Sequence, residues 1–229
     1  MSRTILITGA NGHLGREVLP ILHSDGHSII AVTGSKAIPE GLEKEAVKLE
    51  RVNLFEEAET NAFIRKTIEE NPDLDAAVLL AGGYAPGSME ETDEASIDQQ
   101  ITLNFKTAWF VVKPVLEHFK QRKEGQFIFI GARPAILPEA GKHNVAYALS
   151  KSLLLSLAEI INAEGKPYGI TASVIILSTL DTYANRKEMP GADYANWVPP
   201  ADVADTIRFV LSDAGKKLRQ PVYKLFNKA

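Results

Sequence analysis

Tyr147 and Lys151 are the residues whose types and spacing could do chemistry. They stand four residues apart in the segment Tyr-Ala-Leu-Ser-Lys, and residues four apart lie on the same face of a helix. The Lys151 ammonium can therefore approach the Tyr147 phenol and favour its phenolate, which would make the phenol a proton donor near neutral pH. Alone, this spacing more often marks two amphipathic residues on an ordinary helix. The pair predicts catalysis only in a wider context.

A glycine-rich turn at residues 8–15, Thr-Gly-Ala-Asn-Gly-His-Leu-Gly, follows the first apolar run and supplies that context. Glycine permits positive φ, lets backbone N–H groups approach a pyrophosphate and allows close packing of strand and helix. The pattern differs from the usual Gly-x-Gly-x-x-Gly, and a turn without a ligand is the alternative. Together with the Tyr/Lys pair, it predicts a nicotinamide-dependent oxidoreductase. The residues expected to contact the cofactor here are Gly9, Asn11, Gly12, His13, Leu14 and Gly15.

The end of the second apolar run bears on which cofactor binds. An acidic residue there would hold the adenosine ribose and repel a 2′-phosphate, whereas small, hydroxyl and basic residues accommodate the phosphate. The sequence has Thr33, Gly34, Ser35 and Lys36 at this point. It therefore predicts NADP(H), with NAD(H) as the alternative. His13 could add a contact to the phosphate, although an ordinary polar loop would also explain these residues.

The elements that must position these groups alternate along the chain. Apolar, β-branched runs bounded by turn residues predict seven strands, at 4–8, 28–33, 46–53, 76–81, 126–130, 171–177 and 222–226. Helical patterns lie between them, at 14–24, 56–71, 97–122, 145–164 and 201–212. Such alternation predicts an α/β fold, a doubly wound Rossmann-like three-layer sandwich with a seven-stranded parallel sheet. No linker divides residues 1–229, so we expect a single domain.

Two further features bear on the site. Ala81, Gly82 and Gly83 follow the fourth strand and would let the backbone run against a ligand at the carboxyl edge of the sheet. Asn104 stands among apolar residues of the long helix, where its amide must be satisfied. A hydrogen bond that bends the helix is the structural alternative for Asn104.

In order and spacing, the glycine turn, Asn104, Tyr147 and Lys151 resemble the short-chain dehydrogenase/reductase superfamily over essentially the whole chain. The resemblance implies that Lys151 binds the nicotinamide ribose and lowers the pKa of Tyr147, that Tyr147 protonates the substrate, and that Asn104 holds a water in a proton relay. It also implies cofactor contacts along the carboxyl edge, at Asn53, Leu54, Ala81, Gly82, Gly83, Leu177, Leu180 and Thr182.

The chain departs from the family at two places. The serine usually found about thirteen residues before the tyrosine is missing, since residues 131–135 carry no hydroxyl, and the usual Pro-Gly after the sixth strand is replaced by Leu177-Ser178. Both departures resemble the quinoid dihydropteridine reductase branch, as do residues 80–83 and 179–193. That branch implies reduction of a small conjugated imine or carbonyl substrate, with a pterin foremost, although it uses NADH and has an acid after the second strand. A generic ketone or quinone reductase and a non-catalytic NAD(P)-binding sensor are the alternatives.

Two segments bear on substrate binding and on subunit assembly. Residues 181–198 lack periodicity and carry interleaved aromatic residues, which predicts a mobile substrate loop, with an ordinary packed connection as the alternative. The helix at 145–164 is apolar on more than one face. One face should meet the sheet and the other a second subunit, so we expect a homodimer or homotetramer, against the alternative of a buried helix in a monomer.

Composition limits the partners. The 25 basic and 29 acidic residues give a net charge of −4 and no broad positive field, so nucleic acid and anionic membranes are not expected to bind. The chain has no cysteine, and its five histidines lack ligand spacing, so no metal is expected. The first apolar run is too short for a secretory signal, and no uninterrupted apolar stretch approaches a membrane span. A small-molecule substrate and a cytoplasmic location are expected.

Overall fold

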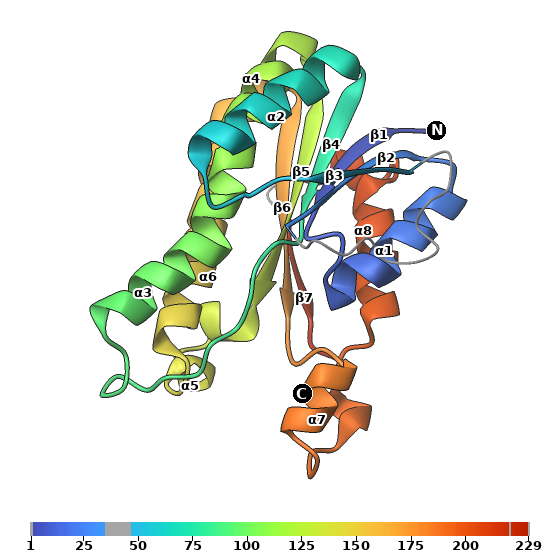
Figure 1. Ribbon diagram of the computed structural model, residues 1–229. Helices are drawn as coiled ribbons and strands as arrows, with labels where there is room; N and C mark the ends of the chain where they lie inside the picture. The colour runs from blue at the N-terminus through green and yellow to red at the C-terminus, as the bar shows by residue number, and fades with distance from the viewer. Residues whose placement is uncertain (1, 35–46, 220, 229) are drawn as a thin grey trace.

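The computed structural model describes residues 2–34, 47–219 and 221–228. Its centre is a seven-stranded sheet in the order β3-β2-β1-β4-β5-β6-β7, and all neighbouring strands run parallel (Figure 1). The strands are β1 (Thr4–Thr8), β2 (Ser28–Thr33), β3 (Val47–Arg51), β4 (Leu74–Leu79), β5 (Gly125–Ala132), β6 (Ile170–Leu177) and β7 (Val222–Leu225). The predicted Rossmann-like sheet is confirmed, with β1 and β2 at the predicted bounds.

The fourth strand lies two residues earlier than predicted. It starts at Leu74, which pairs with Thr4 through a register shift between Thr4 and Ile5. Leu80 and Ala81 consequently follow the strand, outside the β4 hydrogen-bond ladder. The loop at the carboxyl edge of the sheet is therefore longer than the apolar run indicated.

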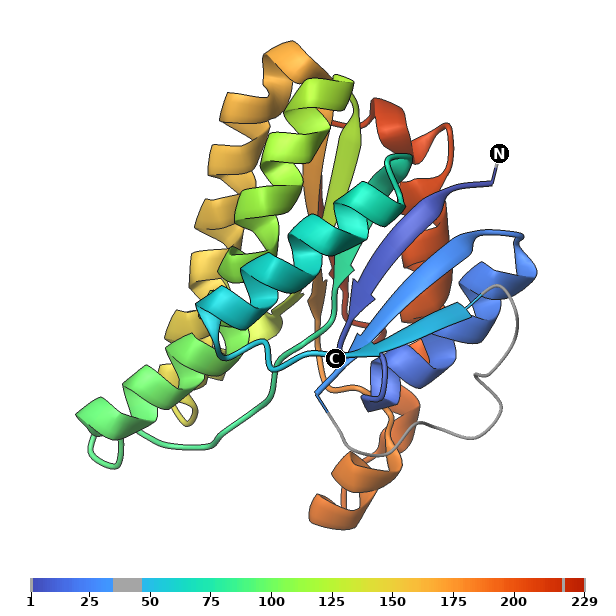
Figure 2. The ribbon, with the colours of Figure 1, turned by 45° about the horizontal axis from the view of Figure 1, so that its top comes forward.

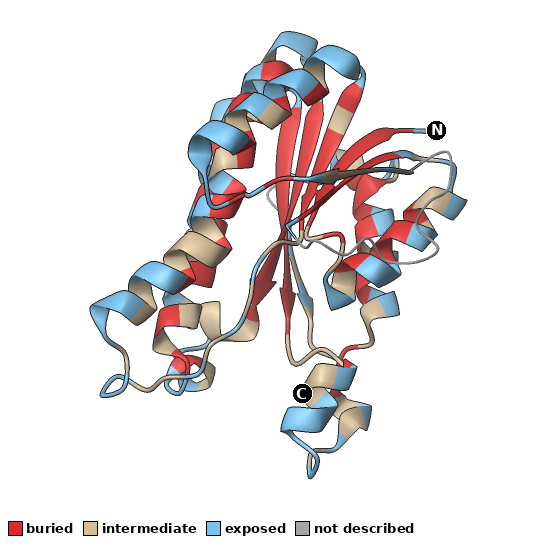
Figure 3. Cartoon of the chain, viewed as in Figure 1, coloured by how far each residue is buried: buried red, intermediate tan, exposed pale blue. Residues whose placement is uncertain are grey.

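Helices cover both faces of the sheet, as Figures 1 and 2 show. The main helices are α1 (His13–Ser24), α2 (Glu57–Glu70), α3 (Glu94–Ile101), α4 (Thr107–Arg122), α6 (Val145–Gly165) and α8 (Pro200–Leu211). Apolar side chains of α2, α4 and α6 pack on one face, and those of α1 and α8 pack on the other. Strand residues contribute alternately to these two clusters, which explains why β1, β2, β4, β5 and β6 are buried over most of their length (Figure 3). The described side chains of the edge strands β3 and β7 are half-buried or exposed.

The long predicted helix contains a π-helical turn, η1 (Thr102–Lys106), between α3 and α4. At its end the Thr107 N–H bonds to the Thr102 carbonyl, five residues back. Asn104 lies in the middle of this turn and is fully buried. Such turns are frequent at functional sites because the extra residue redirects the side chains of one turn.

The segment after β6 is more ordered in its secondary structure than predicted. It contains α7 (Tyr183–Glu188) and the 3₁₀ turn η4 (Tyr194–Asn196). The Thr182 hydroxyl accepts the Asn185 N–H and caps α7, and the Arg186 guanidinium lies 4.7 Å from the centroid of the Tyr194 ring. These short-range contacts explain a helix that apolar periodicity could not reveal, because the helix has no buried face.

One helical segment, Val145–Tyr168, is long and apolar enough, by length and composition alone, to cross a membrane. Polar residues are distributed along this segment, so it contains no long uninterrupted apolar stretch. Core helices meet the same test, and α6 packs against β5 and β6 through side chains such as Leu154 and Leu157.

Candidate active site and cofactor pocket

The glycine turn after β1 is shaped by close backbone approach. Gly9 has a φ of +68°, and a Cβ there would lie 2.7 Å from the Ala81 nitrogen. A Cβ on Gly15 would lie 2.5 Å from the Gly9 carbonyl oxygen. Gly12 has an ordinary φ of −70°. Positive φ is therefore needed at Gly9, whereas Gly15 is needed for space between the turn and the first turn of α1.

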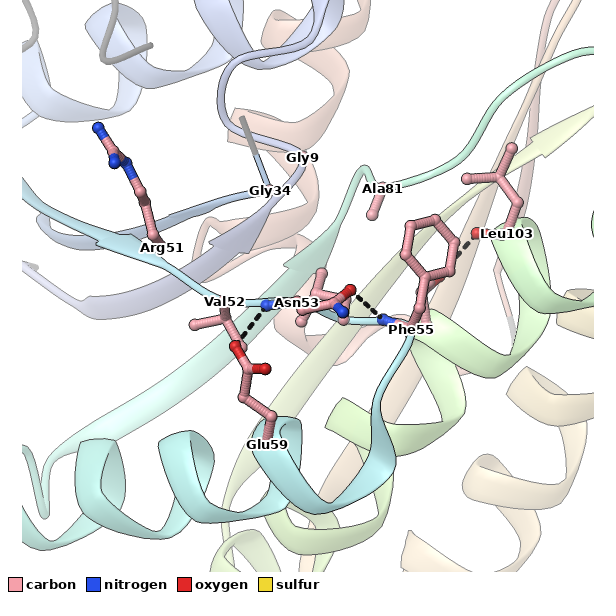
Figure 4. A pocket seen from close by; sticks show the side chains of 11 residues that line it. Gly9, Gly34, Arg51, Val52, Asn53, Phe55, Glu59, Ala81 and Leu103 are labelled. Carbon is pink, nitrogen blue, oxygen red and sulfur yellow. Dashed lines mark hydrogen bonds between the residues drawn. The ribbon is translucent and has the colours of Figure 1, made fainter. Parts of the chain in front are cut away.

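A cavity of about 280 Å³ opens beside this turn (Figure 4). Five of the residues predicted to contact a cofactor line it, namely Gly9, Gly34, Asn53, Leu54 and Ala81. The loop after β3 is fixed by the Asn53 N–H, which donates to the Glu59 carboxylate at 2.8 Å, and by the Asn53 side-chain oxygen, which accepts the Phe55 N–H. The tertiary structure thus gathers residues from four segments around one hollow.

Several residues that line this cavity were not predicted. They are Arg51, Val52, Phe55, Glu59, Leu103 and Thr107. Arg51 ends β3 and pairs in register with Thr33, the last residue of β2. The predicted ends of the second and third strands carried this signal, since neighbouring parallel strands bring their carboxyl ends together.

Asn104 joins three segments at the carboxyl edge. Its side-chain oxygen accepts the Gly83 N–H at 3.0 Å. Its amide NH₂ donates to the Gly83 carbonyl, to Gln100 at 3.0 Å and to the Ser150 hydroxyl at 3.1 Å. The Ser150 hydroxyl in turn donates to the Tyr147 carbonyl at 2.8 Å. The loop after β4 is therefore tied through the π turn to the first turns of α6.

Lys151 lies in the same cluster, with a relative exposure of 6%. Its ammonium donates to the Ile130 carbonyl of β5 at 2.9 Å. A Cβ on Gly82 would lie 3.2 Å from this nitrogen and 2.6 Å from the Asn104 oxygen. Burial lowers the pKa of Lys151 to about 8, because an ammonium loses hydration in this setting.

Tyr147 lies one helical turn before Lys151 on α6, beside a second tyrosine. The rings of Tyr84 and Tyr147 meet edge to face, with centroids 5.1 Å apart and planes at 76°. Burial, with a smaller contribution from Tyr84, raises the pKa of Tyr147 to about 12. The expected lowering of the Tyr147 pKa by Lys151 is wrong for this structure, because burial raises this pKa and the Lys151 ammonium donates to the Ile130 carbonyl.

The other predicted site residues are placed as follows. Asn11 bonds to the Arg16 guanidinium, and the exposed His13 begins α1, followed by Leu14. Thr33 ends β2 with 2% exposure. Leu177 ends β6, Leu180 bridges to Val198, and Thr182 caps α7. Ser35 and Lys36 lie outside the described residues.

A dinucleotide fits this arrangement. The turn at Gly9 and Gly15 leaves no room for Cβ atoms, as expected where backbone N–H groups approach a phosphate at a helix N-terminus. The cavity beside it lies at the carboxyl ends of β2, β3 and β4, where parallel sheets of this kind bind ligands. Across the part of the chain that the structure describes, no three His, Asp or Glu side chains gather where they could hold a metal ion.

Comparison with known proteins agrees with this geometry. Residues 3–192 match the sequence model of the short chain dehydrogenase family. A dihydropteridine reductase of Dictyostelium discoideum is 28% identical over 211 residues, covering 90% of this chain and 87% of that protein. A 3-oxoacyl-acyl-carrier-protein reductase FabG of Rickettsia felis is 26% identical over 224 residues, covering 92% and 90%.

Solved structures share the fold. The structure described as ElxO with NADP bound superposes with a TM-score of 0.88 at 19% identity, covering 98% of this chain and 97% of that one. A short-chain type dehydrogenase/reductase from Mycobacterium ulcerans gives a TM-score of 0.87 at 22% identity, covering 100% and 90%. With the glycine turn, the cavity and the Tyr147 and Lys151 cluster on one edge of the sheet, the chain belongs to the short-chain dehydrogenase family of nicotinamide-dependent oxidoreductases.

Proposed function

We propose that this protein uses NADP(H) to reduce a small conjugated imine or carbonyl substrate, with Tyr147 as the proton donor. The observation that carries the proposal is the cluster in which hydrogen bonds link Gly83, Asn104, Ser150 and the backbone carbonyl of Tyr147, beside the buried Lys151 ammonium. This cluster and the glycine turn occupy the same edge of the sheet, which is where a dinucleotide and its substrate would meet.

The chain's residues divide the chemistry between them. When bound, the nicotinamide supplies a hydride, so the substrate needs one proton to complete its reduction. Tyr147, with a pKa of about 12, carries its proton at neutral pH and can donate it. Lys151, with a pKa of about 8, is mostly charged at pH 7, can stabilise the phenolate left behind and would hold the nicotinamide ribose.

We propose that Asn104 is a positioning residue of the proton relay. Its side-chain oxygen and NH₂ are already used by Gly83, Gln100 and Ser150. Through these bonds it fixes the loop after β4 against the helix that carries Tyr147 and Lys151. The water of the proton relay would then be positioned by the loop after β4 and by α6, which Asn104 holds together.

The surroundings of Tyr147 favour a planar, conjugated substrate. The aromatic side chain of Tyr84 has 58% of its surface exposed and is therefore available to a flat ligand beside Tyr147. Its loop is held by the Gly87 N–H bond to His143 and the Val145 N–H bond to Gly87. Ala132, at the end of β5, has no hydroxyl to polarise an isolated carbonyl. A quinonoid ring needs less polarisation, because reduction restores its aromaticity, and a pterin is our leading candidate.

Turnover tests this proposal directly. The protein should oxidise NADPH in the presence of a quinonoid dihydropterin, and more slowly with a para-quinone or a 3-oxoacyl thioester. A faster rate with the quinone or the thioester would favour the generic reductase activity suggested by the FabG relative. Cofactor binding without oxidation on any of the three would contradict a reductase and favour a NAD(P)-binding sensor.

We expect NADPH to bind at least about tenfold more tightly than NADH, since the residues directly after β2 in the sequence, Gly34, Ser35 and Lys36, carry no carboxylate to oppose a 2′-phosphate. Gly34 is the place to test this, because it is exposed and, among the residues that the structure describes, a Cβ there would meet only the Val52 carbonyl, at 3.9 Å. Gly34→Asp should reverse the preference, since the carboxylate would hold the ribose hydroxyls and repel the phosphate. Fluorescence titration of both cofactors measures it.

Gly34→Asn is the matched control, because it has the same shape without the charge. It should retain the preference for NADPH. If the parent protein binds NADH as tightly as NADPH or more tightly, the NADH preference of the dihydropteridine reductase branch holds for this chain as well.

We further propose that residues 1–229 act as a single domain in the cytoplasm and assemble as a homodimer or homotetramer. Leu149 and Ile160 are exposed on α6, with the half-buried Leu153 between them at helical spacing. Burying these side chains would contribute about 25 cal/mol per Å² of apolar area. Light scattering should give a mass of at least two chains, whereas a monodisperse monomer at micromolar concentration would contradict this role of α6.

A further inference from the structure

We propose that Arg51 is a specificity-determining residue that binds the 2′-phosphate of the adenosine ribose. This assignment rests on the NADP(H) use proposed above and adds a residue at the edge of the sheet to the site. Arg51 is the last residue of β3 and lines the cavity together with Gly9 and Gly34.

The strand register places Arg51 beside the end of β2. Thr33 and Arg51 are the last aligned pair of these parallel strands, and aligned residues of neighbouring strands turn their side chains to the same face. Val32 and Val52 belong to the core cluster of α2, α4 and α6. Because successive residues alternate between faces, Thr33 and Arg51 turn to the opposite face, the one covered by α1.

Two charged side chains that line the cavity, Arg51 and Glu59, also lie on opposite sides of the β3 segment (Figure 4). Among the described residues that line the cavity, Arg51 is the only basic side chain and Glu59 the only acidic one. Glu59 reaches the Asn53 N–H from α2, while Arg51 extends from the other side of the β3 segment, on the side of Gly34 (Figure 4). The positive charge therefore lies on the side of the cavity that carries the end of β2.

A guanidinium suits this task. It donates two parallel hydrogen bonds to phosphate oxygens and keeps its charge at any working pH. NADH carries a hydroxyl where NADPH carries the phosphate, so a contact from Arg51 to this group would strengthen NADPH binding alone. Arg51 would thus supply discrimination, whereas the glycine turn would serve both cofactors equally.

Arg51→Gln, Arg51→Lys and Lys48→Gln test the assignment by fluorescence titration with NADPH and NADH. Lys48 is the matched control: it lies on the same strand, pairs with Ile30 of the opposite face and loses the same charge. We expect Arg51→Gln to weaken NADPH binding about tenfold or more, and NADH binding less than about twofold. Arg51→Lys should fall between the parent and Arg51→Gln, because the charge remains without the paired hydrogen bonds. Lys48→Gln should match the parent for both cofactors.

Other results would overturn the assignment. If the parent prefers NADPH and Arg51→Gln leaves its affinity unchanged, Arg51 is excluded while the proposed function stands. If Arg51→Gln weakens the binding of NADPH and of NADH equally, Arg51 supports the shape of the cavity and does not recognise the phosphate. A parent that binds neither cofactor would overturn the proposed function and the assignment together.

Discussion

Replacing Tyr147 by phenylalanine is expected to lower kcat by about 10²- to 10⁴-fold, the usual contribution of a positioned proton donor. The affinity for NADPH should stay close to that of the parent, because the ring keeps its edge-to-face contact with Tyr84 and the change removes only a hydroxyl. Stopped-flow turnover with the best substrate and fluorescence titration of NADPH measure the two quantities separately. A loss in kcat without a loss in binding is the signature of an interaction made in the transition state.

Tyr84→Phe is the matched control, since it removes the same hydroxyl from the neighbouring ring. Its kcat should remain within a few-fold of the parent, because the proposed part of Tyr84 is played by its ring. A parent-like kcat for Tyr147→Phe would show that the proton comes from elsewhere. With a pterin, that result would mean that the reduced ring takes its proton from water.

Replacing Lys151 by methionine should stop turnover and yet stabilise the fold. The pKa of the buried ammonium drops from an ordinary 10.5 to about 8, which at 1.36 kcal/mol per pKa unit is a cost of about 3 kcal/mol near pH 7. Methionine removes this cost. It also leaves the Ile130 carbonyl without its donor, which destabilises the fold by about 1 kcal/mol. The expected net gain in the free energy of unfolding at pH 7 is about 2 kcal/mol.

The pH dependence of this gain follows from the direction of the shift. Because the folded-state pKa is the lower one, the cost is fully present below pH 8. It disappears as pH rises from about 8 towards 10.5, where the unfolded chain still binds the proton and the folded chain does not. Urea unfolding of parent and variant at pH 7 and near pH 10 should therefore show a large difference at the first pH and a small one at the second.

Turnover supplies the second readout for Lys151. The parent should lose activity as pH rises through about 8, since the ammonium that supports the phenolate is lost there. Lys151→Arg keeps a cation with a much higher pKa and should move this fall to higher pH if the larger head is accommodated. A Lys151→Met variant with parent-like kcat, or one less stable than the parent at pH 7, would contradict the assigned role or the assigned cost.

The order of the strands and helices could be predicted from the amino-acid sequence alone. Runs such as Val174 to Leu177 and the glycine turn after Thr8 are local signals, because burial on two faces and a tight strand-to-helix turn each constrain consecutive residues. For the same reason the sequence pointed to the segments that bear Tyr147, Lys151 and Asn104. Helix α7 escaped prediction because it is held by a capping hydroxyl and not by an apolar face.

Only the tertiary structure decided how these segments act on one another. Arg51 and Glu59 line the cavity because the carboxyl end of β3 lies beside that of β2, on the same edge of the sheet as the ends of β1 and β4, although these segments are distant in sequence. The pKa of Tyr147 rises where helical spacing alone predicted a fall, because burial depends on every segment packed around the phenol. The chain's local pattern therefore determined which residues are available for chemistry, and long-range packing determined their solvation, their partners and their charge.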